Sequence, residues 1–308
     1  MPPALSTMWM QHRSDRVLAW WETVRQLGFT RIELSSILTV DMMEGVRPGD
    51  PPVSSIHFPV PAVKHLEARR SPDELLSSPN EDLRRWAVEE SRRTLDLAAE
   101  LGAQAMCVHL GQVHVLRHLE WVVYQRHAGG YRGTPAYRQA LDRLLAARQE
   151  AAEPHFTAAR RSLAELARHA EAVGVRLGIE TRLHVYEIPN REEAERLLAE
   201  HDPAVVGLWY DCGHVQVQAN LGLDAPAAWL ESLGPRIVAT HLHDVRGLRD
   251  HLLPRPGGDV DFALLTAHLP ATALRVCEFD WYFEPEEVVA AVSYLAATGC
   301  CHPLIPPE

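Results

Sequence analysis

The segments VRLGIET (175–181), REEAERLLAE (191–200) and VVGLWYD (205–211) follow one another closely along the chain. The first and third are short apolar runs, which are typical of buried strands. The second carries its apolar residues at helical spacing, which predicts a helix. Apolar strands separated by helices indicate a parallel sheet that helices cover. This strand–helix–strand unit therefore sets the expected fold class, which is α/β.

The same alternation extends over the whole chain of 308 residues. We expect eight strands, which lie within 4–10, 31–35, 53–60, 105–111, 175–181, 205–211, 236–244 and 274–279. Eight strands with intervening helices predict a closed (β/α)8 TIM barrel, here a single domain over residues 1–308. A doubly wound open sheet is the competing interpretation, but no G-x-G-x-x-G or G-x-x-x-x-G-K pattern supports a nucleotide-binding crevice.

The segment 112–135 interrupts this alternation, because it mixes aromatic residues, histidines and glycines. A helical pattern follows from 136 to 172, and Pro154 is expected to interrupt it. We therefore expect an extended loop and helix insertion after the fourth strand. Its aromatic residues suit either a lid over the barrel or a contact between subunits.

Charge and cysteine content limit the functions that the chain can have. The formal net charge of −11 argues against nucleic acid as the main partner, since phosphates bind Lys and Arg. The five cysteines form no C-x-x-C pair, so disulfides are not expected and the cytoplasm is the expected compartment. We expect neither a signal peptide nor a membrane span, because no basic start precedes a long apolar run.

In a TIM barrel the carboxyl ends of the strands form one rim, and the active site lies there. Seven successive expected strands carry an acidic or imidazole side chain near this end, namely Glu33, His57, His109, Glu180, Asp211, His241 and Glu278. The last four are separated by 31, 30 and 37 positions, close to one strand–helix unit each. We therefore expect these four side chains to converge at the mouth of the barrel.

Three carboxylates and one imidazole in this arrangement predict a divalent metal site. A single acid at a strand end is more often a helix N-cap. Three unpaired carboxylates on one rim would repel one another, however, and a cation removes that cost. The oxygen-rich set favours Mn²⁺, with Mg²⁺, Co²⁺ or Zn²⁺ as alternatives. Period two places His243 on the same strand face as His241, so spacing does not choose between these two.

Five short motifs resemble the xylose isomerase-like TIM barrels: IETR, YDCGH, ATHLHD, DHLLPRPGGDVDF and VCEFD. That superfamily contains sugar isomerases and epimerases, and also the family 2 apurinic endonucleases that are similar to endonuclease IV. The resemblance favours His241 over His243, because His241 heads the H-[L/I]-x-D pattern. It implies a single divalent ion bound by Glu180, Asp211, His241 and Glu278.

The resemblance also implies roles for other rim residues. Those expected to contact substrate are His214, His251, His109, His57 and Glu33. Histidines that match His57 and His109 bind zinc in the endonuclease-like members, so a second metal site of His57, His109 and Asp250 is a further hypothesis. The chain departs from the Asp-x-His of those members, because His251 directly follows Asp250. Gly213, in YDCGH, is interpreted as permitting a tight turn after the sixth strand.

These residues favour a metal-dependent isomerase or epimerase that acts on a sugar or sugar-derived substrate. The ion would polarise a carbonyl and an adjacent hydroxyl. Glu180 and Glu278 would then move the proton, through an enediolate intermediate. Phosphodiester cleavage at an abasic DNA site and non-catalytic sugar binding are the two alternatives. A small carbohydrate is the expected partner, and a homo-oligomer is compatible with the sequence.

Overall fold

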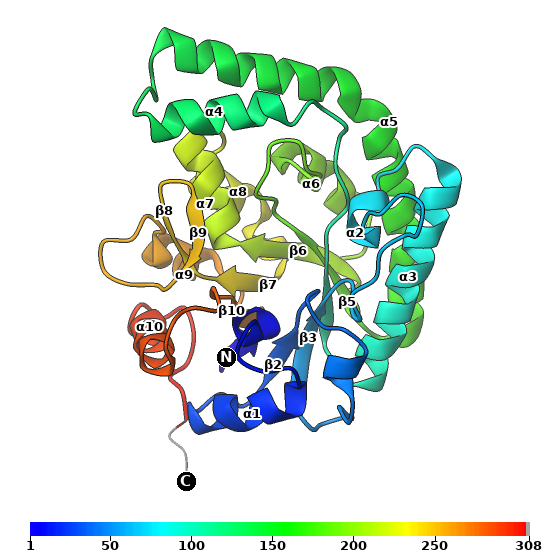
Figure 1. Ribbon diagram of the computed structural model, residues 1–308, viewed down its shortest axis with the longest axis vertical. Helices are drawn as coiled ribbons and strands as arrows, with labels where there is room; N and C mark the ends of the chain where they lie inside the picture. The colour runs from blue at the N-terminus through cyan, green and yellow to red at the C-terminus, as the bar shows by residue number, and fades with distance from the viewer. Residues whose placement is uncertain (306–308) are drawn as a thin grey trace.

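The computed structural model describes residues 1–305, and its centre is a closed barrel of eight parallel strands (Figure 1). Strands that are consecutive in the chain are neighbours in the barrel, and the last pairs with the first. The (β/α)8 TIM barrel predicted from the alternation is therefore confirmed. The barrel strands are β1 (Ala4–Ser6), β2 (Ile32–Leu34), β3 (Val53–His57), β4 (Ala105–Val108), β5 (Arg176–Glu180), β6 (Val206–Asp211), β7 (Ile237–Leu242) and β10 (Leu274–Cys277).

Helices surround the barrel and cover the outer faces of its strands (Figure 1). Their starts follow from local capping: Asn190 and Glu193, for example, form a reciprocal capping box at the first turn of α6. The α-helices are α1 (Val17–Gln26), α2 (Pro72–Leu75), α3 (Glu81–Glu100), α4 (His118–Ala128), α5 (Pro135–Val173), α6 (Arg191–Ala199), α7 (Cys212–Leu221), α8 (Pro226–Leu233), α9 (Phe262–His268) and α10 (Pro285–Ala297).

Several strands are shorter than the apolar runs that predicted them. The first strand ends at Ser6, because the Ser6 hydroxyl accepts a hydrogen bond from the Met8 N–H and starts a 3₁₀ turn over Thr7–Met10. The third strand ends at His57, and Pro59 beyond it has no N–H to donate to a neighbouring strand. Apolar composition alone does not separate a strand from the buried turn after it.

The predicted insertion after the fourth strand is present as α4 and the first part of α5, which lie along one end of the molecule (Figure 1). The expected interruption at Pro154 is wrong, because α5 runs through this proline, which is exposed on its surface. The insertion has a small apolar core of its own, formed with parts of the rim: Leu119, Val123, Tyr137, Leu141, Leu144, Val185 and Leu221.

Two elements near the rim were not predicted. Helix α7 follows β6 without a loop, because the Asp211 side chain accepts a hydrogen bond from the His214 N–H and caps the helix. The segment after β7 forms an antiparallel hairpin of β8 (Asp244–Arg246) and β9 (Arg249–Leu252), although no strand was expected between 244 and 274. Both elements lie beside the carboxyl ends of β6 and β7.

The barrel interior below the rim is closed by apolar packing. Trp209 is fully buried there, and a Cβ on Gly178 would lie 2.7 Å from its indole ring, so glycine makes room for it. All five cysteines are buried free thiols, in agreement with the expected lack of disulfides. Within residues 1–305, no helix is long and apolar enough to cross a membrane.

Candidate active site

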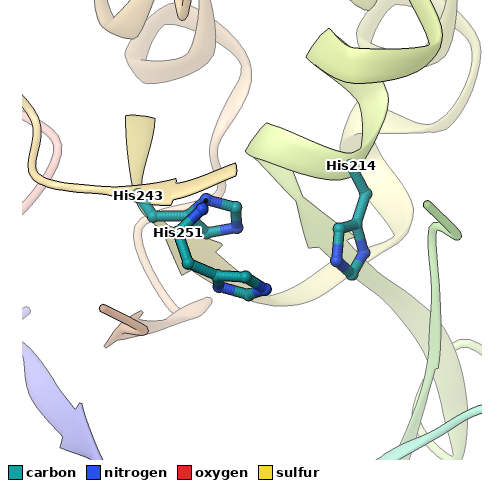
Figure 2. Close-up of side chains that lie close together, drawn as sticks. All are labelled: His214, His243 and His251. Carbon is teal, nitrogen blue, oxygen red and sulfur yellow. Dashed lines mark hydrogen bonds between the residues drawn. The ribbon is translucent and has the colours of Figure 1, made fainter. Parts of the chain in front are cut away.

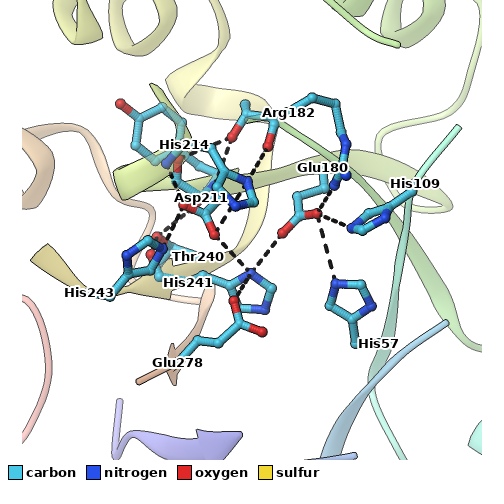
Figure 3. Close-up of polar contacts among 12 residues, drawn as sticks. His57, His109, Glu180, Arg182, Asp211, His214, Thr240, His241, His243 and Glu278 are labelled. Carbon is cyan, nitrogen blue, oxygen red and sulfur yellow. Dashed lines mark hydrogen bonds and ion pairs between the residues drawn. The ribbon is translucent and has the colours of Figure 1, made fainter. Parts of the chain in front are cut away.

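Neighbouring strands of the barrel bring the four predicted metal ligands together at its mouth (Figure 3). Glu180 and Asp211 end β5 and β6, His241 lies near the end of β7, and Glu278 directly follows β10. In the register of the barrel, Asp211 pairs with His241. Each of the four offers a donor atom, and these atoms all lie within 4.8 Å of one another. Their role as metal ligands stays a prediction.

The imidazole of His241 lies at the centre of this group. Its Nδ1 atom is 2.8 Å from Glu180 Oε1, 3.2 Å from Glu278 Oε2 and 3.3 Å from Asp211 Oδ2. Its Nε2 atom is 3.2 Å from Glu33 Oε1, so Glu33 contacts the far side of the ring. A ring nitrogen carries at most one proton, which cannot neutralise the three carboxylates that face Nδ1.

The chemistry of the donor set fits a divalent cation. Asp211 is fully buried, yet among residues 1–305 its Oδ2 atom has no hydrogen-bond partner. Leaving a buried carboxylate oxygen unpaired is costly unless a charge compensates it. Three carboxylates and one imidazole nitrogen form an oxygen-rich set of the kind that Mn²⁺ or Mg²⁺ accepts.

The two glutamates of the group have opposite pKa shifts. Burial raises the pKa of Glu278 and outweighs the nearby His241 and His251, which act to lower it. Burial also acts to raise the pKa of Glu180, but contacts with His109, His241 and Arg182 outweigh it and hold this pKa well below its usual range. Glu278 is therefore the glutamate that accepts a proton more readily.

Two more imidazoles approach the other oxygen of Glu180. His57 Nε2 is 3.8 Å and His109 Nε2 is 2.5 Å from Glu180 Oε2. Burial and Arg182 lower the pKa of His109, but Glu180 and Asp73 outweigh them and raise it to about 8. Burial lowers the pKa of His57 to about 4. The two imidazoles beside Glu180 therefore have opposite pKa shifts.

A second group of imidazoles lies on the hairpin side of the mouth (Figure 2). His214 Nε2 and His251 Nε2 lie 3.8 Å and 3.6 Å from Asp250 Oδ2. This buried oxygen has no hydrogen-bond partner in the described part of the chain. Nδ1 of each ring faces a backbone oxygen, of Thr181 for His214 and of Glu278 for His251, so both Nε2 atoms are left to face Asp250.

The structure does not bring the three residues of the hypothetical second metal site together. His57 and His109, from β3 and the segment after β4, lie beside Glu180. Asp250 belongs to β9, which packs against α7 and therefore places it with His214. Glu33 is fully buried and accepts a hydrogen bond from the Ser55 hydroxyl, so it supports His241 from below. The sequence did not show how the hairpin folds back.

Comparison with known proteins identifies the family of this fold. Residues 71–297 match the family described as "Xylose isomerase-like TIM barrel", which is well over half of the chain. The chain belongs to this family.

Solved structures share the fold of this xylose isomerase-like barrel. A D-tagatose 3-epimerase-like protein aligns over 97% of both chains, with a TM-score of 0.66 and 16% identity. The 3-keto-D-glucoside 4-epimerase of E. coli covers 98% of this chain and 100% of its own, with a TM-score of 0.64 and 18% identity. D-Psicose 3-epimerase from Clostridium cellulolyticum H10 covers 97% and 99%, with a TM-score of 0.64 and 13% identity.

One curated relative shares sequence over a shorter stretch. Over 124 residues the chain is 32% identical to the uncharacterized protein y4fM of Sinorhizobium fredii. The match covers 40% of this chain and 37% of that relative, so the chain spans well under half of its length.

Two polar residues of this xylose isomerase-like site were missed in the sequence. Arg182 is buried, and its guanidinium contacts both Glu180 and Glu187. It stands two positions after Glu180 in the IETR motif, so the same motif carried a usable signal for it. Asp73 orients His109 through a 3.1 Å contact with its Nδ1, but it lies in the short helix α2, which no periodic pattern marks.

A cavity of about 210 Å³ adjoins this site, and its lining includes His109 and Asp73 with His184 and Tyr186. Its walls are largely polar, as a site for a hydroxyl-rich ligand would be. A larger hollow of about 810 Å³ lies between α5 and α6, but none of the predicted site residues lines it.

Proposed function

We propose that this protein is a divalent-metal-dependent isomerase or epimerase that acts on a sugar or sugar-derived substrate. The observation that carries the proposal is the convergence of three carboxylates on one side of His241, with a buried oxygen of Asp211 left without a hydrogen-bond partner. The substrate class is supported by the sugar epimerases among solved structures of the same fold. Mn²⁺ is the ion expected at Glu180, Asp211, His241 and Glu278.

A bound divalent ion would supply polarisation of a substrate carbonyl and its neighbouring hydroxyl, which acidifies the C–H bond between them. Glu278 accepts that proton, because its raised pKa makes it the stronger base of the two glutamates. Glu180, at the end of β5, would return a proton to the substrate. His109, whose pKa is raised and whose Nε2 is 2.5 Å from Glu180 Oε2, would supply that proton.

Histidines around the mouth orient the substrate in this proposal. His214 and His251 present Nε2 atoms toward the mouth, where they hydrogen-bond substrate hydroxyls. His109 and Asp73 line the adjoining polar cavity. Glu33 and His57 are buried around His241 and Glu180, and there they hold the ligands in place.

Two measurements on the purified protein test the proposal. Elemental analysis is expected to find one equivalent of a divalent metal, manganese first. Incubation with a panel of ketoses and aldoses in D₂O is expected to exchange the C–H proton next to the carbonyl of the true substrate, as followed by NMR. A protein that binds no divalent ion and exchanges no substrate proton would contradict the proposal.

The Glu278→Gln variant tests the proton acceptor directly. We expect kcat to fall by about 10²- to 10⁴-fold, because the amide cannot take the proton. Metal content measured on the same sample separates loss of the base from loss of the ion. Glu286→Gln is the matched control, since it removes the same charge from an exposed position in the first turn of α10. It is expected to keep full activity.

An abasic-site phosphodiesterase is the second candidate. The observation that favours it is the presence of extra imidazoles beside Glu180 and beside Asp250, since such groups hold additional ions in metal-dependent nucleases. Elemental analysis would then find two or three equivalents of zinc. The protein would nick an abasic duplex, and a chelator would stop it. The net charge of −11 opposes this candidate, and absence of nicking would eliminate it.

Three further properties concern the location, the partner and the assembly of this protein. A cytoplasmic location, a small carbohydrate as partner and assembly into a homo-oligomer stay predictions. Size-exclusion chromatography with light scattering decides the last of these. Trp121 and Leu116 of the insertion are exposed and are the first residues to replace if a dimer is found.

A further inference from the structure

His243 is a fully buried histidine at the rim that the proposed mechanism does not use. Its Nε2 atom donates a hydrogen bond to Asp211 Oδ1 over 2.9 Å. Its Nδ1 atom accepts a hydrogen bond from the backbone N–H of His251, also over 2.9 Å. The ring therefore links a candidate metal ligand on β6 to the hairpin β8–β9.

These two hydrogen bonds determine the protonation state of the ring. One proton is on Nε2, which donates to Asp211 Oδ1. A second proton would be on Nδ1, however, where the His251 N–H already donates. Two donors cannot share one hydrogen bond, so the observed geometry requires a neutral ring with its proton on Nε2.

The chain makes room for this ring at Gly213. A Cβ on Gly213 would lie 2.0 Å from His243 Cε1 and 2.5 Å from its Nδ1. Gly213 lies inside α7 and its φ is not positive, so the interpretation of this glycine as a tight turn is wrong. Glycine is needed here for space, and the space is filled by the His243 imidazole.

The ring determines which oxygen of Asp211 faces the metal site. Asp211 Oδ1 accepts two hydrogen bonds, from His243 Nε2 and from the His214 N–H. With Oδ1 held by two donors, Oδ2 is the oxygen that faces His241 and lacks a hydrogen-bond partner among residues 1–305. A carboxylate held in this way is oriented for a cation before the cation arrives.

The ring also determines the conformation of the hairpin. His251 has a φ of +51°, in the left-handed region that non-glycine residues rarely adopt. Its N–H bonds His243 and its carbonyl accepts a hydrogen bond from the Asp280 N–H, so the strained residue is held on both sides. In this conformation its side chain lies at the mouth beside His214 (Figure 2). Its Nε2 atom is 3.6 Å from Asp250 Oδ2.

We propose that His243 is a positioning residue that couples the metal site to the substrate side of the mouth, by holding Asp211 through Nε2 and His251 through Nδ1. The inference rests on the proposed function in one respect, which is that Asp211 is a metal ligand. His243 itself is not a ligand, because both of its nitrogens are engaged, although His214, His243 and His251 lie close enough to suggest a shared ion.

Two substitutions separate the two hydrogen bonds. In His243→Gln the amide N–H₂ reaches the position of Nε2, so the bond to Asp211 is kept and that to His251 is lost. In His243→Asn the amide oxygen occupies the position of Nδ1, so the bond to His251 is kept and that to Asp211 is lost. We expect Mn²⁺ affinity, measured on metal-free protein by competition with a chelating indicator, to fall about 10- to 100-fold in His243→Asn. It is expected to stay near the wild-type value in His243→Gln.

Substrate binding, in contrast to Mn²⁺ binding, is expected to respond to His243→Gln. His243→Gln should raise KM for the substrate found by the proton-exchange screen, because His251 is released, while kcat changes little at saturating Mn²⁺. Equal losses of Mn²⁺ affinity in the two variants would contradict the proposal and indicate that His243 is itself a ligand. If the wild-type protein binds no divalent ion, the proposed function fails first.

The tautomer of His243 is a test that needs no metal and no variant. Nitrogen-15 NMR of the metal-free wild-type protein is expected to show a neutral ring protonated on Nε2. A proton on Nδ1 would overturn the proposal even if the metal site is real, because Nδ1 could then not accept the His251 N–H.

Gly213→Ala completes the set as a double-mutant cycle. In the wild-type background the added methyl group displaces the imidazole, and Mn²⁺ affinity is expected to fall as it does in His243→Ala. In the His243→Ala background the same methyl group meets no ring, so Gly213→Ala is expected to cause little further loss. Additive losses would show that Gly213 acts independently of His243, which contradicts the proposal.

Discussion

Asp211 shows how one side chain serves two roles with its two oxygens. Oδ1 caps α7 through the His214 N–H, which is the structural role that acids at strand ends most often have. Oδ2 faces His241 and the other carboxylates of the mouth. The interpretations of Asp211 as a helix cap and as a metal ligand are therefore compatible, because each uses a different atom.

Gly258, in the loop after β9, lies directly against the carboxylate of Asp244. A Cβ on Gly258 would lie 1.6 Å from Asp244 Oδ2, while Asp244 Oδ1 accepts hydrogen bonds from the N–H groups of Val245 and Val260. Gly258→Ala is expected to displace this carboxylate and lower the free energy of unfolding by about 1–3 kcal/mol. Urea denaturation measures the change. Gly234→Ala is the control, because its nearest neighbour is 3.4 Å away and little change is expected.

At the scale of elements, the contact between α3 and α5 depends on a buried arginine. Arg84 is 1% exposed and donates hydrogen bonds to Glu81 of its own helix and to Glu165 and Ser162 of α5. Hydrogen bonds to charged groups contribute about 1.5–3 kcal/mol each in favourable cases. The pair of helices is therefore held by a polar network as well as by apolar packing.

Replacing Arg84 by methionine is expected to lower the free energy of unfolding by about 2 kcal/mol, because the network is lost while the apolar stem is kept. Arg85→Met is the matched control. Arg85 also contacts Glu81, but its side chain is 69% exposed, and water replaces that contact at little cost. Equal effects of the two substitutions on the urea midpoint would show that burial of Arg84 is not the cause.

The same network predicts a pH dependence. Hydrogen bonding to Arg84, with a further contribution from Arg85, outweighs partial burial and lowers the pKa of Glu81 to about 2 from an ordinary 4.5. A pKa that is lower in the folded state stabilises the fold above the unfolded value, and the contribution is lost as pH falls from about 4.5 to about 2. The urea midpoint of Glu81→Gln is expected to change less than that of the wild type over this interval. If the two urea midpoints changed equally with pH, the lowered pKa of Glu81 would not be the cause.

At the scale of the whole molecule, closure of the barrel brings together residues from strands that are far apart in the chain. Glu33 and His241 are 208 positions apart and 3.2 Å from each other. The mouth therefore concentrates negative charge that no single segment carries. A cation that binds only the folded mouth must stabilise the whole barrel, because the unfolded chain scatters its ligands.

Removal of metal is therefore expected to lower the melting temperature. An ion at 100 times its dissociation constant adds about 2.7 kcal/mol to stability. Scanning calorimetry before and after chelation is expected to show a decrease of several degrees, which Mn²⁺ reverses. Asp211→Asn is the control, and its melting temperature is expected to respond weakly to either treatment. A wild-type protein that melts at the same temperature with and without chelator would argue against a metal site.

The sequence by itself determined the barrel, because buried parallel strands and amphipathic helices carry a local periodicity that repeats along the chain. It also placed Glu180, Asp211, His241 and Glu278 on one rim, since strand ends recur at nearly constant spacing. It did not separate strands from the turns after them, as at Thr7–Met10, nor show that α5 passes through Pro154. In both places local hydrogen bonding and packing override composition.

Only the tertiary structure decided how the rim residues are connected. The hairpin of β8 and β9 places Asp250 with His214 and away from His57, and it turns His243 from an alternative metal ligand into a link between Asp211 and His251. These contacts depend on which atom of each side chain faces which neighbour. A sequence pattern specifies the face of a strand, whereas hydrogen-bond partners come from segments that meet only when the chain has folded.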